Sequence, residues 1–125
     1  MSGRGGSIDP KVLDIERLLP IFGDDPVQLR EIIEEAVTTS ASLVERLGTL
    51  CAQKSAEATH AAHELKGLAK TVGAGELGTL SERAEDDARC SRWDELLAKI
   101  GPLREAHARF SKAAVALGDD IAGSE

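Results

Sequence analysis

Two histidines, two lysines and a glycine share one face of a predicted helix near the middle of the chain. Residues 60–74 read HAAHELKGLAKTVGA. At about 100° per residue in an α-helix, the residues within about 60° of His63 are Thr59, His60, Lys66, Gly67 and Lys70. The far side is apolar, with Ala58, Ala61, Ala62, Leu65, Leu68, Ala69 and Val72. The segment therefore predicts a helix with one buried stripe and one solvent face that carries imidazole and ammonium groups.

Gly67 is the informative residue on this solvent face. A glycine inside a helix costs roughly 1 kcal/mol relative to alanine, and core packing does not explain one on the exposed side. Its missing side chain leaves a dent one turn after His63, where another molecule could approach closely. Neutral imidazole is a good nucleophile near neutral pH, and the nearby ammonium groups favour a phosphoryl group. The pattern is therefore typical of chemistry on an anion.

The run His63-Glu64-Leu65-Lys66-Gly67-Leu68-Ala69, followed by Val72-Gly73-Ala74 and Leu77, resembles the histidine-containing phosphotransfer (HPt) domain family. The resemblance implies an all-α fold, an antiparallel four-helix bundle with a short N-terminal capping helix. It also implies a phosphorelay in which His63 takes a phosphoryl group from a receiver-domain aspartate and passes it to another receiver. Lys66 would give electrostatic support, and Gly67, Thr59, His60 and Lys70 would form the receiver docking face.

The same resemblance implies the partners. These would be response-regulator receiver domains and a hybrid histidine kinase, and the Mg²⁺ would be bound by the receiver. The chain itself is expected to be a cytoplasmic monomer that holds no metal or cofactor, binds no ATP and has no activity alone, so an enzyme label stays open. One departure concerns Ala36, where the family often has a Phe; Phe22 or Phe110 is expected to fill the core there.

Composition supports an all-α domain and excludes several classes of protein. The chain has 125 residues, 30% of them charged, and its few aromatic residues are Phe22, Phe110 and Trp93, so its core must be aliphatic. A net charge of −7 argues against a nucleic-acid partner. No apolar stretch approaches the roughly 18 residues of a membrane span, and the N-terminus does not resemble a secretory signal. Cys51 and Cys90 predict reduced thiols.

Capping signals and apolar periodicity predict the remaining helices. A short helix is expected from Asp9-Pro10 to Leu19, ended by Pro20 and Gly23, and a long one from Asp25-Pro26 to near Gly48. Ser55 is the predicted N-cap of the central helix, and Gly73 its left-handed end. The last helix is expected from Ser91 to Gly118, kinked or interrupted at Gly101-Pro102.

The helix between the central helix and the last one is expected to bury its apolar residues and expose its charged ones. The apolar residues are Leu77, Leu80, Ala84 and Ala88, and the charged ones are Glu82, Arg83, Glu85, Asp86, Asp87 and Arg89. We expect one HPt domain over residues 8–118, between a disordered tail at residues 1–7 and a frayed tail at residues 119–125.

Each candidate residue also has a structural interpretation. His60 is more often a surface residue than a second phosphorylation site, and His107, on the apolar stripe of the last helix, more often a satisfied core histidine than a ligand. Lys70 could be an ordinary solubilising lysine. Metal binding by His60 and His63 lacks a carboxylate or cysteine to complete the ligand set.

Two other functions remain open at this point. His63-Glu64-Leu65-Lys66 also resembles the phosphoacceptor box of sensor histidine kinases, which form dimers through a helix pair. In that box a Thr-Pro pair follows the basic residue, whereas Gly67-Leu68 follows here, and the sequence has no Gly-rich ATP site. A helical docking module that transfers no phosphate is the third possibility.

Overall fold

The fold is all-helical over the residues that the computed structural model describes, which are 8–124, with side chains to residue 120. The helices are α1 (Ile15–Phe22), α2 (Pro26–Ala52), α3 (Glu57–Thr71), α4 (Gly75–Arg89) and α5 (Trp93–Ser124). The described residues contain no strand. The predicted all-α fold class is thereby confirmed.

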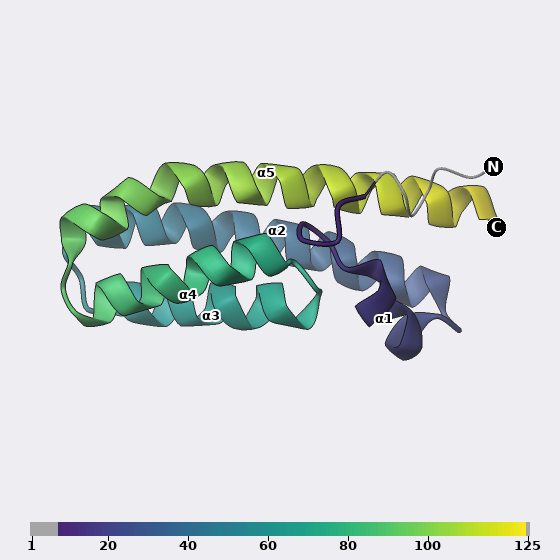
Figure 1. The fold of residues 1–125 in the computed structure, drawn as a ribbon, viewed down its shortest axis with the longest axis horizontal. Coiled ribbons are helices and arrows are strands. Elements are labelled where there is room, and N and C mark those ends of the chain that lie inside the picture. Colours follow the sequence, from purple (N-terminus) through teal and green to yellow (C-terminus); the bar gives the residue numbers. More distant parts are fainter. Residues whose placement is uncertain (1–7, 125) are drawn as a thin grey trace.

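Helices α2 and α5 run the length of the molecule, and the shorter α3 and α4 pack beside one half of them (Figure 1). Each of α2 to α5 packs against two others, α2 on α3 and α5, and α4 on α3 and α5. Helix α1 packs on α2 near the other end. Consecutive helices from α2 to α5 run in alternating directions (Figure 1), so α3 and α4 form a hairpin that carries the candidate residues.

The core is aliphatic, as the composition predicts. Leu47, Leu65, Leu96 and Leu103 are fully buried, one from each of α2 and α3 and two from α5. Burying a leucine side chain stabilises the fold by about 1.5–3 kcal/mol. Of the two aromatic residues expected to fill the core, Phe110 is 1% exposed, whereas Phe22 is only partly buried.

Helices α2, α3 and α4 are each followed by a turn that contains a residue in the left-handed conformation. At the end of α3, Gly73 has φ +74°, the Ala74 N–H donates to the Ala69 carbonyl at 2.8 Å, and the Gly73 N–H donates to the Lys70 carbonyl. These two bonds form a Schellman motif, and the left-handed end predicted at Gly73 is confirmed. Lys54 and Ser91 hold the same position after α2 and α4, with φ of 51° and 57°.

Residues 8–14, which precede α1 and are called the N-terminal segment below, seal the turn between α3 and α4. The Asp14 N–H donates to the Gly73 carbonyl at 2.9 Å, and the Glu76 N–H donates to the Lys11 carbonyl at 2.7 Å. Helix α4 has no side-chain N-cap, so the Lys11 carbonyl satisfies one of its free N–H groups. A Cβ at residue 73 would lie 3.1 Å from the Asp14 carbonyl oxygen.

The predicted start of the first helix is wrong, whereas its predicted end at Gly23 is confirmed, since Gly23 is the C-cap. The Asp9 carboxylate accepts from the Lys11 N–H, but only a turn forms there. Asp14 caps α1 instead, because its carboxylate accepts from the Arg17 N–H at 3.3 Å. Pro20 lies inside α1 instead of ending it. The carbonyl that would have bonded to residue 20 belongs to Glu16, which is exposed, so water can satisfy it.

The last helix also differs from its prediction. Ser91 is not its N-cap, because its left-handed conformation belongs to the turn that precedes α5. The helix passes Pro102 without a break and continues beyond Gly118 to Ser124. Gly101 and Pro102 are both exposed, so the ring faces water and not the core. The other predicted tail, residues 1–7, lies outside the described residues.

Two further capping predictions hold in part or in full. Asp25 caps α2 through the Gln28 N–H at 2.9 Å, with Pro26 in the first turn as predicted. Ser55 Oγ accepts from the Glu57 N–H at 3.2 Å, one residue before the cap position that Ala56 occupies.

His107 is a satisfied, half-buried histidine whose Nε2 lies 3.0 Å from the Val37 carbonyl oxygen, also as predicted.

Replacing Gly73 with alanine is expected to lower the free energy of unfolding by about 1–2 kcal/mol. The new Cβ would meet both a left-handed backbone and the Asp14 carbonyl oxygen. Urea unfolding measures the change.

Gly101→Ala is the matched control, since no heavy atom lies within 4 Å of a Cβ at this helical position. It should raise stability by up to about 1 kcal/mol. A Gly73→Ala protein as stable as the original would contradict the role given to this turn.

Candidate functional site

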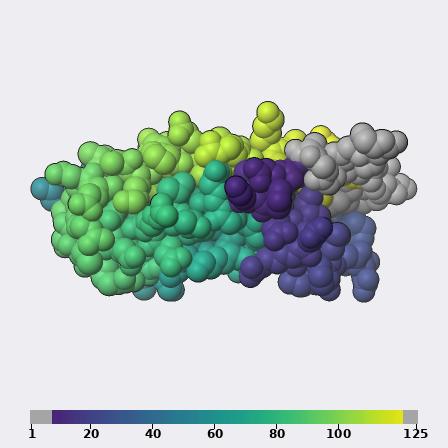
Figure 2. All heavy atoms as spheres, in the orientation of Figure 1, coloured from purple at the N-terminus to yellow at the C-terminus, as the bar shows by residue number. Residues whose placement is uncertain are grey.

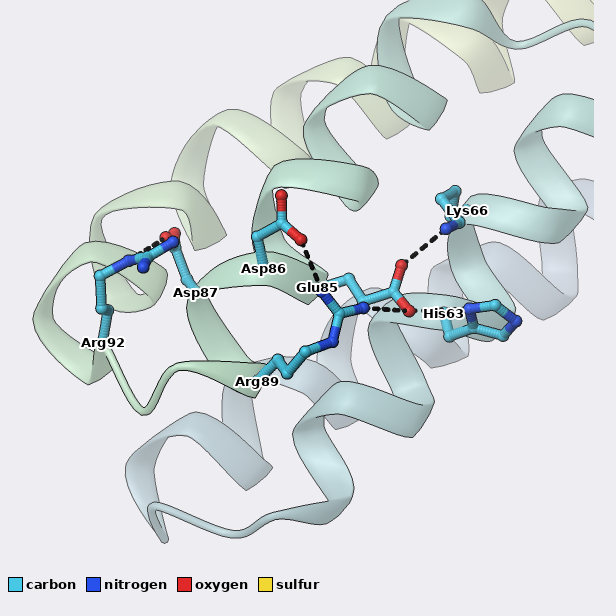
Figure 3. Close-up of polar contacts among 7 residues, drawn as sticks. All are labelled: His63, Lys66, Glu85, Asp86, Asp87, Arg89 and Arg92. Atoms are coloured by element: carbon cyan, nitrogen blue, oxygen red, sulfur yellow. Dashed lines mark hydrogen bonds and ion pairs between the residues drawn. The ribbon is translucent and has the colours of Figure 1, made fainter.

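His63 stands on the outer face of α3 with 63% of its side chain exposed. The predicted stripe on the opposite side of α3 is packed away, with Ala58, Ala61, Ala62, Leu65, Ala69 and Val72 buried and Leu68 partly buried. One ring nitrogen is bound: Nδ1 lies 2.8 Å from Oε2 of Glu85 on α4 (Figure 3). The other, Nε2, has no partner among the described residues.

Glu85 links the residues of the site. Its side chain is only 7% exposed, and Lys66 Nζ lies 2.7 Å from its Oε1. Arg89, one turn further along α4, places a guanidinium nitrogen 3.1 Å from Oε2. One buried carboxylate therefore holds an imidazole and an ammonium from α3 and a guanidinium from its own helix (Figure 3).

Small residues let α4 lie close enough to α3 for these contacts. A Cβ at Gly78 would be 3.6 Å from the Ala69 Cβ, and Ser81 is fully buried one turn later. The Ser81 hydroxyl donates to the Leu77 carbonyl at 2.7 Å, so burying it leaves no unsatisfied group. Glu85 follows one turn after Ser81 and reaches the level of His63.

The Glu85 carboxylate is anionic in the folded protein. Burial alone would raise its pKa, but hydrogen bonds from Lys66 and His63, together with their positive charge, hold the pKa below its ordinary value. An anionic carboxylate accepts hydrogen bonds and cannot donate them. The hydrogen in the contact with His63 therefore sits on Nδ1.

The position of that hydrogen decides the chemistry of the ring. In a neutral imidazole with Nδ1 protonated, Nε2 carries the free lone pair. That nitrogen is the nucleophilic atom, and it belongs to the exposed ring. The site thus offers a nucleophile to a partner from outside, with cationic groups beside it.

The remaining predicted site residues lie on the same face of α3. Gly67 is exposed, and no heavy atom lies within 4 Å of a Cβ built there, so the expected dent opens to solvent. His60 is exposed and Thr59 is half-buried. Lys70 pairs with Glu82 of α4 at 3.6 Å, with both side chains more than half exposed. Such a pair contributes little to stability.

Glu85 and Arg89 were not predicted as site residues. The sequence interpretation placed the charged residues of α4 on a solvated face, which is wrong for Glu85 and for Asp87, whose side chains are 7% and 5% exposed. The i,i+4 spacing of Glu85 and Arg89 was the available signal. It did not reveal that the carboxylate turns toward α3.

Asp87 joins α4 to α5 on another side of the helix. Its carboxylate accepts from Arg92 Nε at 3.1 Å and pairs with Lys99 of α5. Close by, the buried Cys51 thiol donates to the Trp93 carbonyl at 3.5 Å. Burial raises the pKa of this thiol, with a smaller contribution from Asp94. Cys51 and Cys90 are both free.

The described part of the chain contains neither a metal-ligand cluster nor a membrane-spanning helix. No cluster of three or more His, Cys, Asp or Glu side chains there could hold a metal ion. None of the helices in that part is long and apolar enough to cross a membrane.

The Hpt domain family matches residues 29–115, well over half of the chain. The protein therefore belongs to the Hpt domain family, whose members carry out histidine phosphotransfer in two-component phosphorelays and interact with receiver domains and kinases. The match spans α3 and α4 with all the residues of the site and most of α2 and α5. Curated proteins and solved structures gave no match.

The lowered pKa of Glu85 predicts a pH-dependent contribution to stability. Because the carboxyl has a lower pKa folded than unfolded, its ionised form stabilises the fold at pH above its unfolded pKa of about 4.5. That contribution is lost as the pH falls through the folded pKa. Glu85→Gln should therefore unfold more readily than the original protein near neutral pH, and the difference should shrink below pH 4.5.

Urea unfolding over a range of pH measures this difference. Glu82→Gln, which removes an exposed partner of Lys70, is the control and should change stability little at any pH. A Glu85→Gln protein equally destabilised at acidic and neutral pH would show that the lost stability does not come from the carboxylate charge.

Proposed function

We propose that His63 is the phosphoacceptor of this Hpt domain, receiving a phosphoryl group from a receiver-domain aspartate and passing it to a second receiver. The observation that carries the proposal is the exposed ring with Nδ1 bonded to Glu85 and Nε2 left free. We further propose that α2 to α5 form an antiparallel four-helix bundle capped by α1, within a domain starting at residue 8. The protein would act as a cytoplasmic monomer.

The transfer requires few steps on this chain. Nε2 of His63 attacks the phosphorus of the aspartyl phosphate in line; the new N–P bond forms as the P–O bond to the acyl oxygen breaks, and the aspartate leaves as a carboxylate. The proton on Nδ1 stays between the ring and Glu85. The reverse sequence returns the group to another receiver.

The cations held by Glu85 suit the product. A phosphoryl group on Nε2 would bring negative charge to the surface that also carries Lys66 and Arg89, which the Glu85 carboxylate fixes at 2.7 Å and 3.1 Å. Fixed cations stabilise a developing anion without reorganising first. The Mg²⁺ that assists the reaction would be bound by the receiver, as membership of the Hpt family implies.

The docking surface is proposed to extend from Gly67 onto the neighbouring helix. Beside Gly67, a hollow of about 200 Å³ lies between α2 and α3. Ile32 and Ala36 line it from α2, and Leu68 and Val72 from α3. An apolar side chain of the receiver would fit this hollow while the open position at Gly67 lets its backbone come close to His63.

His63→Gln should abolish phosphate uptake from a phosphorylated receiver and leave helicity and melting nearly unchanged, because the residue is 63% exposed. Incubation with a receiver carrying radiolabelled phosphate measures uptake, and circular dichroism follows the fold. His60→Gln, on the same face of α3, is the control: as a residue of the docking face it should at most lower the rate of transfer, and the protein should still take up phosphate. Uptake retained by His63→Gln, or lost in His60→Gln alone, would contradict the assignment.

Gly67→Arg should block receiver docking yet leave the protein folded, since nothing lies within 4 Å of a Cβ there. The transfer rate from the same receiver should drop by about tenfold or more, as expected when an interface core is obstructed.

Gly101→Arg places the same side chain at another open helical position, on α5, and should transfer at the normal rate. Normal transfer by Gly67→Arg would rule out close docking at this glycine. Light scattering of the original protein measures its mass in solution and so tests the proposal that it is a monomer.

A further inference from the structure

Two hollows lie side by side on the surface where the N-terminal segment meets α4 and α5. One, of about 570 Å³, lies between Lys11 and the first half of α4, and its lining includes Glu76, Leu80 and Arg83. The other, of about 440 Å³, lies between the N-terminal segment and α5, and its lining includes Ile8, Val12, Arg109, Lys112 and Ala116. Figure 2 shows the N-terminal segment, in purple, against the teal atoms of α4 and the yellow-green atoms of α5.

The two hollows are neighbours on the surface, and we call the pair of them the α4–α5 groove. Arg109 of the second hollow pairs with Glu76 of the first at 2.8 Å. Lys11 and Val12, consecutive in the chain, line one hollow each. A ligand segment lying along the groove would therefore meet both hollows.

The groove is lined by four cations, Lys11, Arg83, Arg109 and Lys112, and by two carboxylates, Asp9 and Glu76, so it has a local excess of positive charge in an acidic protein. Lys11, Arg83 and Lys112 are exposed, and none of them forms an ion pair with another described residue. By contrast, Lys66, Lys70 and Arg89 near His63 are all paired with carboxylates of α4. The whole chain carries a net charge of −7, so free cations lining a groove mark where an acidic group would be accepted.

The walls between these cations are apolar. Ile8 is 6% exposed, and Val12, Leu80, Ala113 and Ala116 are partly buried against the core. A groove with apolar walls and a few charged groups suits a ligand that has apolar and acidic side chains together. An amphipathic protein segment has both.

The groove lies away from His63. Glu85 turns toward α3, whereas Thr79 and Arg83 lie about 120–160° around α4 from it. A partner bound in the groove would therefore leave the exposed ring of His63 free for a receiver.

We propose that the α4–α5 groove is a second docking surface, which binds an acidic amphipathic segment of a partner protein while His63 stays open to receivers. A protein segment fits better than nucleic acid or an anionic membrane. Those are extended polyanions, and the net charge of −7 repels them over the protein as a whole. A short acidic segment meets mainly the charges within a Debye length of about 8–10 Å.

Amide-resolved NMR of the isotope-labelled full chain tests the proposal. The probe is a short synthetic peptide with leucine on one helical face and glutamate on the other. It should shift the amide signals of residues 8–12, 75–83 and 109–116 and leave those of α3 around His63 unmoved. The same peptide with lysine in place of glutamate should shift none of them.

Paired charge reversals provide the matched control. Arg83→Glu with Lys112→Glu should weaken binding of the glutamate peptide by about tenfold or more, whereas Arg17→Glu with Arg46→Glu, two exposed helical cations outside the groove, should weaken it by less than about twofold. Shifts centred on His63, equal losses in the two variants, binding of single-stranded DNA in place of the peptide, or no binding would each overturn the proposal. Phosphate uptake by His63 is measured in a separate experiment. A failure of that uptake would contradict the proposed phosphotransfer but would not change the outcome of the peptide-binding test.

Discussion

One buried carboxylate orders the whole site. Glu85 accepts from Nδ1 of His63 at 2.8 Å and holds Lys66 at 2.7 Å and Arg89 at 3.1 Å. A carboxylate at 7% exposure needs such partners, because an unpaired charge would be costly to bury. The same contacts lower its pKa, and as an anion it fixes the proton of the imidazole on Nδ1. The requirement to satisfy Glu85 thus leaves Nε2 as the free nucleophile of the exposed ring.

The rest of the fold places Glu85 beside His63. The left-handed Gly73 turns the chain from α3 into α4, and the N-terminal segment seals this turn through Asp14. Gly78 brings the two helices close together. At the other end of α4, Asp87 bonds to Arg92 and Lys99 and so fixes the helix to α5. An exposed histidine is thereby supported by a rigid pair of helices, which keeps its ring orientation defined before a partner arrives.

The solvent face of α3 and its opposite buried stripe could be predicted from sequence, because helical periodicity alone separates them. So could the left-handed Gly73. Glu85 could not be placed in this way: from Leu77, the centre of the apolar stripe of α4, about 100° per residue puts it about 80° away, at the edge of the stripe. Whether an edge residue faces water or the next helix depends on how closely that helix packs. The start of α1 was missed for a similar reason, since Asp9 and Asp14 are both good caps and tertiary contacts of Asp14 decide between them.

The protonation of the His63 ring tests the account most directly. Long-range nitrogen–proton NMR distinguishes the two ring nitrogens in the free protein at alkaline pH, where an imidazole is neutral. The contact with Glu85 predicts a hydrogen on Nδ1 and a bare Nε2. A ring protonated mainly on Nε2, or an even mixture of the two forms as in a free imidazole in water, would show that Glu85 does not set the nucleophile.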